Sequence, residues 1–245
     1  MLARGPRLIK YGAGFFLSPS APQMIQLRHL SRIYANSGAA LDDVSLNVAD
    51  NEFLAITGPS GCGKSTLMHL LGGLDKPTSG ELFVDGLPLH NADEKALTAY
   101  RRQKIGIVFQ FFNLLPTMTV LENVSVPLLL QGVALARVRE KAERVVDLVG
   151  LSDRSSHFLH QLSGGQMQRT AIARALVHEP RLLLADEPTG NLDSANAEQV
   201  MALLQRISSQ CETTLLVVTH SAEVARVASR RISMRDGKIQ HDTHP

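Results

Sequence analysis

The sequence contains few cysteines and has a small net charge. Only Cys62 and Cys211 are cysteines among 245 residues, and the formal net charge is +2. Two cysteines cannot build a disulfide framework, which argues against a disulfide-stapled secreted protein and favours a reducing compartment. A charge so close to neutrality gives no basis for broad nucleic-acid binding, and we expect no nucleic-acid partner.

Long apolar runs are missing as well. The longest uncharged stretches, residues 11–27 and 123–136, are each interrupted by proline or glycine, and neither supplies the roughly 18–20 apolar residues of a membrane span. Residues 1–23 carry three basic side chains and no acidic one. A signal or transit peptide fits this composition, but we favour a disordered extension or a start codon assigned too far upstream. We expect one domain over residues 24–245.

Short apolar runs alternate with helical patterns along that domain. Apolar runs suited to strands buried on both faces cover residues 53–58, 106–110, 181–186 and 213–220. Helical periodicity covers residues 64–71, 134–149, 166–178 and 195–210. This alternation predicts an α/β fold with a mainly parallel sheet.

Two further segments and one insertion complete the predicted fold. Residues 24–34 and 231–239 have the pattern of antiparallel edge strands, the second turning at Asp236 and Gly237. Residues from about 112 to 166 have helical patterns only, which predicts a helical subdomain inserted into the α/β core.

The strongest chemical signal is the stretch GPSGCGKST, which follows an apolar strand and opens a helix. It matches the phosphate-binding pattern G-x-x-x-x-G-K-S/T. In that pattern the backbone N–H groups surround phosphates, the lysine reaches the β- and γ-phosphates, and the serine hydroxyl ligates Mg²⁺. The predicted nucleotide-binding residues are Gly58, Pro59, Ser60, Gly61, Cys62, Gly63, Lys64, Ser65 and Thr66. An ordinary glycine-rich turn is the alternative, and it leaves the lysine and serine unexplained.

Polar residues close three other apolar strands. Asp186 and Glu187 end one strand, and Gln110 and His220 end two others. Ligands of open α/β sheets bind at the carboxyl ends of the strands, so we expect Asp186 to hold Mg²⁺ and Glu187 to polarise the attacking water. Alternatively, the two acids cap a helix ahead of Pro188, and His220 is a hydrogen-bonded structural residue.

A second anion site is predicted at LSGGQ, residues 162–166. Ser163 can cap the helix that follows, and Gly164 and Gly165 leave its backbone N–H groups unobstructed. One chain therefore carries two candidate phosphate sites about a hundred residues apart.

The order of these motifs, with NLD at residues 191–193 between the acids and His220, resembles the ATP-binding subunits of ABC transporters. The resemblance covers about residues 24–240 and is strongest to the group that includes lipoprotein-releasing ATPases. It implies an ABC-type P-loop domain that hydrolyses ATP with Mg²⁺. It also implies a head-to-tail pair of identical chains, in which LSGGQ of one copy closes over the ATP of the other.

The same resemblance implies further roles for individual residues. Ser163, Gly164, Gly165 and Gln166 would contact the partner copy's nucleotide, and Asp193 would link the two sites. Tyr34 would stack on adenine, although a tyrosine that ends a strand can also be simple packing. Gln110 would sense Mg²⁺ and the water, and His220 would contact the γ-phosphate, acting with Lys64 and Glu187 in catalysis.

The resemblance also implies a membrane partner. Phe111, Phe112, Leu114 and Leu115 stand ahead of Pro116 without an intervening charge. They either pack inside the helical subdomain or receive a cytoplasmic helix of a permease, which would place the chain on the cytoplasmic face of the inner membrane.

There are two alternative functions. The main one is an ABC ATPase that acts without a membrane partner in translation or DNA repair, although such proteins typically fuse two cassettes or insert a coiled coil. The other is a P-loop kinase or GTPase, which has no use for LSGGQ.

Cys62 carries a separate expectation. Because it lies in a loop of amides two residues from Lys64, we expect an accessible thiol that favours its thiolate.

Overall fold

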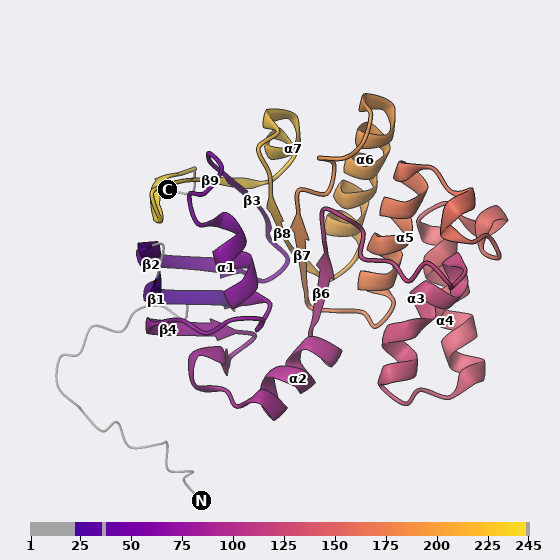
Figure 1. Cartoon of the computed structure of the whole chain (residues 1–245), viewed down its shortest axis with the longest axis horizontal. Coiled ribbons are helices and arrows are strands. Elements are labelled where there is room, and N and C mark those ends of the chain that lie inside the picture. Colours follow the sequence, from indigo (N-terminus) through magenta and orange to yellow (C-terminus); the bar gives the residue numbers. More distant parts are fainter. Residues whose placement is uncertain (1–22, 36–37, 244–245) are drawn as a thin grey trace, which may run out of the picture.

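A computed structural model describes residues 23–35 and 38–243. Figure 1 shows an antiparallel sheet and α1 at one end, parallel strands in the middle and a group of helices at the other end. Apart from Gln23, the extension predicted for residues 1–23 lies outside the described residues. No helix of the described chain is long and apolar enough to cross a bilayer.

The central sheet has six strands and contains all four strands predicted from the apolar runs. Every neighbouring pair is parallel except the pair of β9 and β10. Across the sheet the order is β10 (Lys238–Asp242), β9 (Arg230–Arg235), β3 (Phe53–Thr57), β8 (Thr214–Val218), β7 (Leu182–Asp186) and β6 (Ile105–Val108). The mainly parallel α/β fold is therefore confirmed.

Both faces of this sheet are buried, and alternate residues of a strand enter different cores. Leu184 and Val218 join a core beneath α1 (Lys64–Leu71) and the antiparallel sheet. Leu183 and Val217 join the core on the opposite face, with helices of the second half of the chain. A strand buried on both faces is a continuous apolar run in sequence, which explains why these strands could be predicted.

A second sheet corrects one prediction. Its order is β2 (Gly38–Ala49), β1 (Gln23–Tyr34), β4 (Ser79–Val84) and β5 (Leu87–Pro88), and every pair is antiparallel. The segment predicted as an edge strand, β1, is thus an interior strand of a separate sheet. In β2 buried residues alternate mainly with exposed ones, and in β4 with partly exposed ones, so neither strand has the continuous apolar run that marks the central strands.

The predicted hairpin near the C-terminus is present, with one change. Asp236 (φ 49°) and Gly237 (φ 76°) form its turn, and both left-handed residues suit a tight hairpin. However, β9 pairs in parallel with β3, so only β10 is an antiparallel edge strand.

Helices fill the chain between β6 and β7. They begin at Val120, later than the predicted start near residue 112, because residues 110–119 form turns and irregular chain. The α-helices here are α3 (Val120–Leu130), α4 (Leu135–Leu148) and α5 (Gly164–Leu176). The remaining helices are α2 (Glu94–Gln103), α6 (Ser194–Gln210), α7 (Ala222–Arg226) and the 3₁₀ turns Leu89–Asn91, Ser152–Arg154 and Leu159–Gln161.

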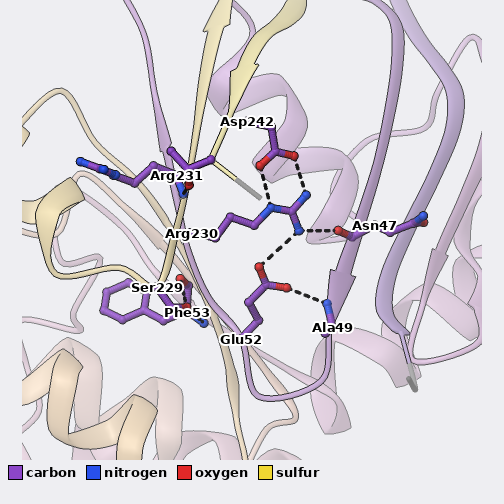
Figure 2. Close-up of polar contacts among 9 residues, drawn as sticks. Asn47, Ala49, Glu52, Phe53, Ser229, Arg230, Arg231 and Asp242 are labelled. Carbon is purple, nitrogen blue, oxygen red and sulfur yellow. Dashed lines mark hydrogen bonds and ion pairs between the residues drawn. The ribbon is translucent and has the colours of Figure 1, made fainter. Parts of the chain in front are cut away.

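A buried guanidinium joins the two sheets at the end opposite the carboxyl edge of β3. Arg230 forms a bidentate pair with Asp242 at 2.8 and 2.6 Å and contacts Glu52 at 3.2 Å. It also donates to the backbone carbonyl of Asn47 in β2, as Figure 2 shows. Its side chain is 11% exposed. The hydrogen bond to Asp242, followed by the charge of Glu52, raises the pKa of Arg230.

Candidate functional site

The carboxyl ends of four neighbouring strands carry the predicted polar residues. In the register of the sheet, Ala185 pairs with Val108 and Asp186 pairs with Val218. Glu187 directly follows the end of β7, and Gln110 and His220 stand two residues beyond the ends of β6 and β8. The loop of residues 58–66, here called the phosphate loop, follows the adjacent strand β3 and runs into α1.

The phosphate loop folds around its lysine. Lys64 is 8% exposed, and its ammonium donates to the carbonyls of Gly58 and Pro59, both at 2.9 Å. Gly58 and Gly63 have left-handed φ values of 150° and 104°. A Cβ on Gly58 would lie 2.3 Å from the Met234 carbonyl oxygen. Only glycine permits this path, and the resulting cradle with a desolvated ammonium fits a phosphate chain.

Cys62 does not have the predicted accessibility. Its side chain is 3% exposed, and its Sγ lies 3.7 Å from Nζ of Lys64. The β9–β10 turn covers this part of the loop, since the Gly237 N–H donates to the Cys62 carbonyl at 3.2 Å. Packing of the C-terminal hairpin, which lies far away in sequence, is the reason why the expectation of an accessible thiol was wrong.

The carboxyl group of Asp186 suits a cation. Burial and the neighbouring Glu187 raise its pKa, while His69 and Lys64 act in the opposite direction. A half-buried carboxylate of this kind is stabilised by a bound cation, and oxygen ligands are what Mg²⁺ prefers. Ser65 stands exposed at the start of α1 and offers a hydroxyl. The residues present therefore fit Mg²⁺ with a nucleotide.

Glu187 and His220 form a pair across the ends of β7 and β8. Nδ1 of His220 lies 2.9 Å from Oε1 of Glu187, and the His220 N–H donates to Oε2 at 3.2 Å. Glu187 adopts a left-handed φ of 44°, and its own N–H donates to the carbonyl of Val218 at 2.9 Å. The Glu187 side chain is 14% exposed, whereas His220 is 69% exposed. The carboxylate is thus fixed in place while the imidazole faces outward.

Tyr34 is held by two residues that sequence reasoning missed. Its hydroxyl donates to Asp75 Oδ2 at 2.8 Å, and the guanidinium of Arg32 lies 4.5 Å from the ring centroid. Arg32 also pairs with Asp75 at 2.8 Å. Asp75 stands 41 residues away in sequence, so no local pattern could have revealed the group.

LSGGQ begins a helix as predicted, but the central sheet separates it from the phosphate loop. Ser163 caps α5 through a reciprocal capping box with Gln166, at 3.3 and 2.9 Å. Helices α1 and α5 pack on opposite faces of the sheet, and β8, β7 and β6 lie between them in Figure 1. Within one chain, the two predicted phosphate sites are therefore separate.

The irregular stretch after Gln110 is held by three side chains that sequence reasoning also missed. Asn191 donates to the carbonyl of Gln110 at 2.9 Å, and Arg174 donates to the carbonyls of Phe112 and Asn113 at 2.9 and 2.6 Å. Asn123 is fully buried and bonds to backbone groups of residues 115, 118 and 119. Phe111 and Leu115 nevertheless remain 73% and 40% exposed.

Comparison with known proteins agrees with this geometry. The family model described as "ABC transporter" matches residues 41–190. The lipoprotein-releasing system ATP-binding protein LolD of Bordetella pertussis is 46% identical, over 89% of this chain and 96% of its own length. LolD 1 of Chlorobium chlorochromatii is 48% identical over 82% of each chain.

Solved structures give the same result. The ATP-binding cassette MJ0796, in a dimeric post-hydrolysis state bound to ADP and Pi, superposes with a TM-score of 0.82 at 41% identity, covering 89% of this chain and 97% of that one. The cbiO1 protein of Clostridium perfringens, part of an ABC transporter complex, gives 0.84 at 28% identity, covering 90% and 88%. The chain belongs to the ABC transporter family and is an ABC-type P-loop ATPase.

Proposed function

We propose that this chain is the ATP-hydrolysing subunit of a membrane complex that releases lipoproteins, and that it works as a pair of identical copies. The observation that carries the proposal is the cluster at the carboxyl edge of the sheet, where Asp186, Glu187 and His220 lie at neighbouring strand ends and Lys64 follows the adjacent strand β3 through the phosphate loop. The similarity to LolD proteins over almost the whole domain supports the lipoprotein cargo.

In this proposal the phosphate loop holds the nucleotide. The ammonium of Lys64 and the loop N–H groups bind the β- and γ-phosphates, and Tyr34 offers its ring to the adenine. Ser65, Asp186 and Gln110 would hold Mg²⁺, which supplies Lewis-acid polarisation of phosphate oxygens when bound. The buried Lys64 has the charge and desolvation needed for tight phosphate binding.

Glu187 is the proposed general base. Its carboxylate is positioned by the His220 N–H and imidazole, both at hydrogen-bond distance, so it presents a fixed acceptor for a proton of the attacking water. The exposed imidazole of His220 would then contact the γ-phosphate from the side that faces outward. His220 therefore both orients the base and binds the reacting group.

The separation of LSGGQ from the phosphate loop supports the paired state. The helix start is formed by Ser163, Gly164, Gly165 and Gln166. A nucleotide bound to the phosphate loop of the same chain cannot reach it, whereas a second copy placed head to tail would bring its own nucleotide there. The similar cassette MJ0796 forms a dimer bound to ADP and Pi, which supports a pair of copies.

The proposed permease site is the docking segment, residues 111–116. Phe111 and Leu115 are exposed. A groove of about 660 Å³ adjoins the segment through Arg174, which lines the groove and donates to the carbonyls of Phe112 and Asn113; the lining also includes Phe109, Pro127 and Leu130. An apolar helix end of a permease fits such a groove, and docking there would hold the chain at the cytoplasmic face of the inner membrane. The helical subdomain would then be the part of the domain that faces the permease.

The alternative, an ABC ATPase without a membrane partner, gains no support from the comparisons. The deciding experiment reconstitutes the chain with its candidate permease in lipid vesicles that carry a lipidated reporter lipoprotein. We expect ATP-dependent transfer of the reporter to a soluble acceptor protein. ATP hydrolysis without transfer would refute the lipoprotein role while leaving the ATPase in place. Absence of any binding to the permease would favour the alternative.

A further inference from the structure

The first turn of α5 and the first turn of α6 share one small space. A Cβ built on Gly165 would lie 2.0 Å from Oδ1 of Asn196 and 2.9 Å from Cβ of Asn196. Gly165 is buried. Both the tip and the base of the Asn196 side chain thus occupy the place of a Gly165 side chain, so a rotamer change alone would not make room.

The preceding glycine behaves differently. A Cβ on Gly164 would have Leu192 Cδ2 as its nearest neighbour, at 3.5 Å, which is an ordinary van der Waals distance. Within the chain itself, a methyl group is therefore tolerated at Gly164 and excluded at Gly165. The requirement for glycine at Gly165 comes from this chain's own α6, whether or not a nucleotide is near.

The same asparagine holds Asp193. Its side-chain Nδ2 donates to Oδ2 of Asp193 at 2.7 Å, and its backbone N–H donates to Oδ1 at 2.9 Å. Both carboxylate oxygens of Asp193 therefore accept from one residue, and these two bonds, the backbone one first, lower the pKa of Asp193. Asp193 is also the N-cap of α6, so its orientation follows that of Asn196.

We infer that Asn196 is a positioning residue that locks the LSGGQ helix start and the Asp193 turn into one unit, and that Gly165 is glycine because Asn196 needs its space. The inference rests on the proposed function, in which both elements face the partner copy's nucleotide. Held together, they meet the partner in a fixed relative position. Without Asn196 each must be ordered separately when the copies pair, which weakens pairing.

The Asn196 side chain affects the pairing of two copies and does not affect nucleotide binding by the single chain. The phosphate loop runs into α1, which packs on the other face of the central sheet from α5 and α6. Loss of Asn196 therefore removes nothing that touches the chain's own phosphate site. Loss of a residue with a merely structural role would instead weaken nucleotide binding and pairing together.

The first test measures the two steps separately in full-length protein that carries Glu187→Gln. Asn196→Ala is compared with Gln199→Ala, an exposed position on the same helix. We expect a fluorescent ATP analogue to bind the Asn196→Ala monomer within about twofold of the parent. Sedimentation should show ATP-driven pairing weakened about tenfold or more, since ordering a side chain or turn costs roughly that factor. Pairing equal to that of Gln199→Ala would overturn the inference.

The second test asks for compensation between Gly165 and Asn196 in ATP-free protein. Gly165→Ala should lower the melting temperature of the parent protein. In the Asn196→Gly background, where the blocking side chain is removed, Gly165→Ala should lower the melting temperature much less. The matched change Gly164→Ala should be nearly neutral for melting and additive with Asn196→Gly. A Gly165→Ala loss that is the same in both backgrounds would overturn the inference.

The two tests keep the inference distinct from the proposed function. If the Glu187→Gln parent does not pair with ATP, the proposed pairing is wrong, and the melting experiment still decides whether Asn196 excludes a side chain at Gly165. If Gly165→Ala alone fails to fold, recovery of folded protein in the double variant supports the inference, and its absence contradicts it.

Discussion

The carboxylate of Glu187 is held by His220, through Nδ1 at 2.9 Å and the backbone N–H at 3.2 Å. This pairing joins the ends of two neighbouring parallel strands. One residue thus supplies two donors to one carboxylate, and the remaining acceptor directions of Glu187 stay available for water. The first prediction follows from this geometry.

Replacing Glu187 by glutamine should leave ATP binding intact and lower hydrolysis by about 10²–10⁴, the usual loss for a general base. The amide keeps the shape of the side chain but cannot take a proton. The measurements are phosphate release and a sizing column run with ATP, on which an ATP-bound pair of chains should accumulate. Glu198→Gln, exposed on α6, is the control. Near-normal turnover of Glu187→Gln would refute the assignment.

Mixing two inactive variants should restore part of the activity. Lys64→Ala damages the phosphate loop, and Ser163→Arg blocks the helix start offered to the partner copy. A mixed pair of chains retains one undamaged composite site, so ATPase should recover in part on mixing. Ser163→Arg that is fully active by itself would contradict the sharing of sites.

Alkylation should separate the two cysteines by rate and by pH. Cys62 is buried, so we expect slow labelling that is limited by opening of the phosphate loop, slower still with MgATP, and accompanied by loss of ATPase. Burial raises the pKa of the Cys211 thiol, so its thiolate fraction and labelling rate should rise at a higher pH than for a free cysteine. MgATP should not change the Cys211 rate. An unchanged Cys62 rate with MgATP would mean that loop opening does not control access.

A charge in the docking segment should disrupt the permease complex. Leu115→Glu should leave basal ATPase nearly intact and abolish co-purification with the permease, because an unpaired carboxylate in an apolar interface costs several kcal/mol. Leu87→Glu is the matched control, since both leucines are 40% exposed and Leu87 lies on the antiparallel sheet. Retained binding by Leu115→Glu would move the docking surface elsewhere. Unfolding would show that Leu115 contributes to the core.

The Arg230 cluster should be a major source of stability. Arg230→Met removes the guanidinium that pairs with Glu52 and Asp242, and breaking such a largely buried group costs about 3 kcal/mol in the free energy of unfolding. Arg28→Met breaks the pair with Glu81, in which the side chains are 61% and 47% exposed, and should cost less than about 1 kcal/mol. Urea unfolding measures both. Equal losses would show that burial of the cluster is not what matters.

The central strands and the phosphate loop could be predicted because their signals are local. A strand buried on both faces is an apolar run, and a phosphate loop needs glycine, lysine and serine at fixed spacing. The antiparallel sheet lacked such a signal. In β2 and β4 buried residues alternate with exposed or partly exposed ones, so these strands were not predicted and β1 was wrongly predicted to lie at an edge.

The sequence alone determined the class of protein, the motifs and the buried parallel strands of the central sheet, because each depends on residues close together in the chain. The tertiary structure decided the pairs that complete the site. Asp75 reaches Tyr34, His220 reaches Glu187 and Asn196 fills the space beside Gly165. Each pair joins residues about 30 or more positions apart. Such contacts depend on which strands and helices become neighbours and on which rotamers the packing allows, and hydrophobic periodicity records neither.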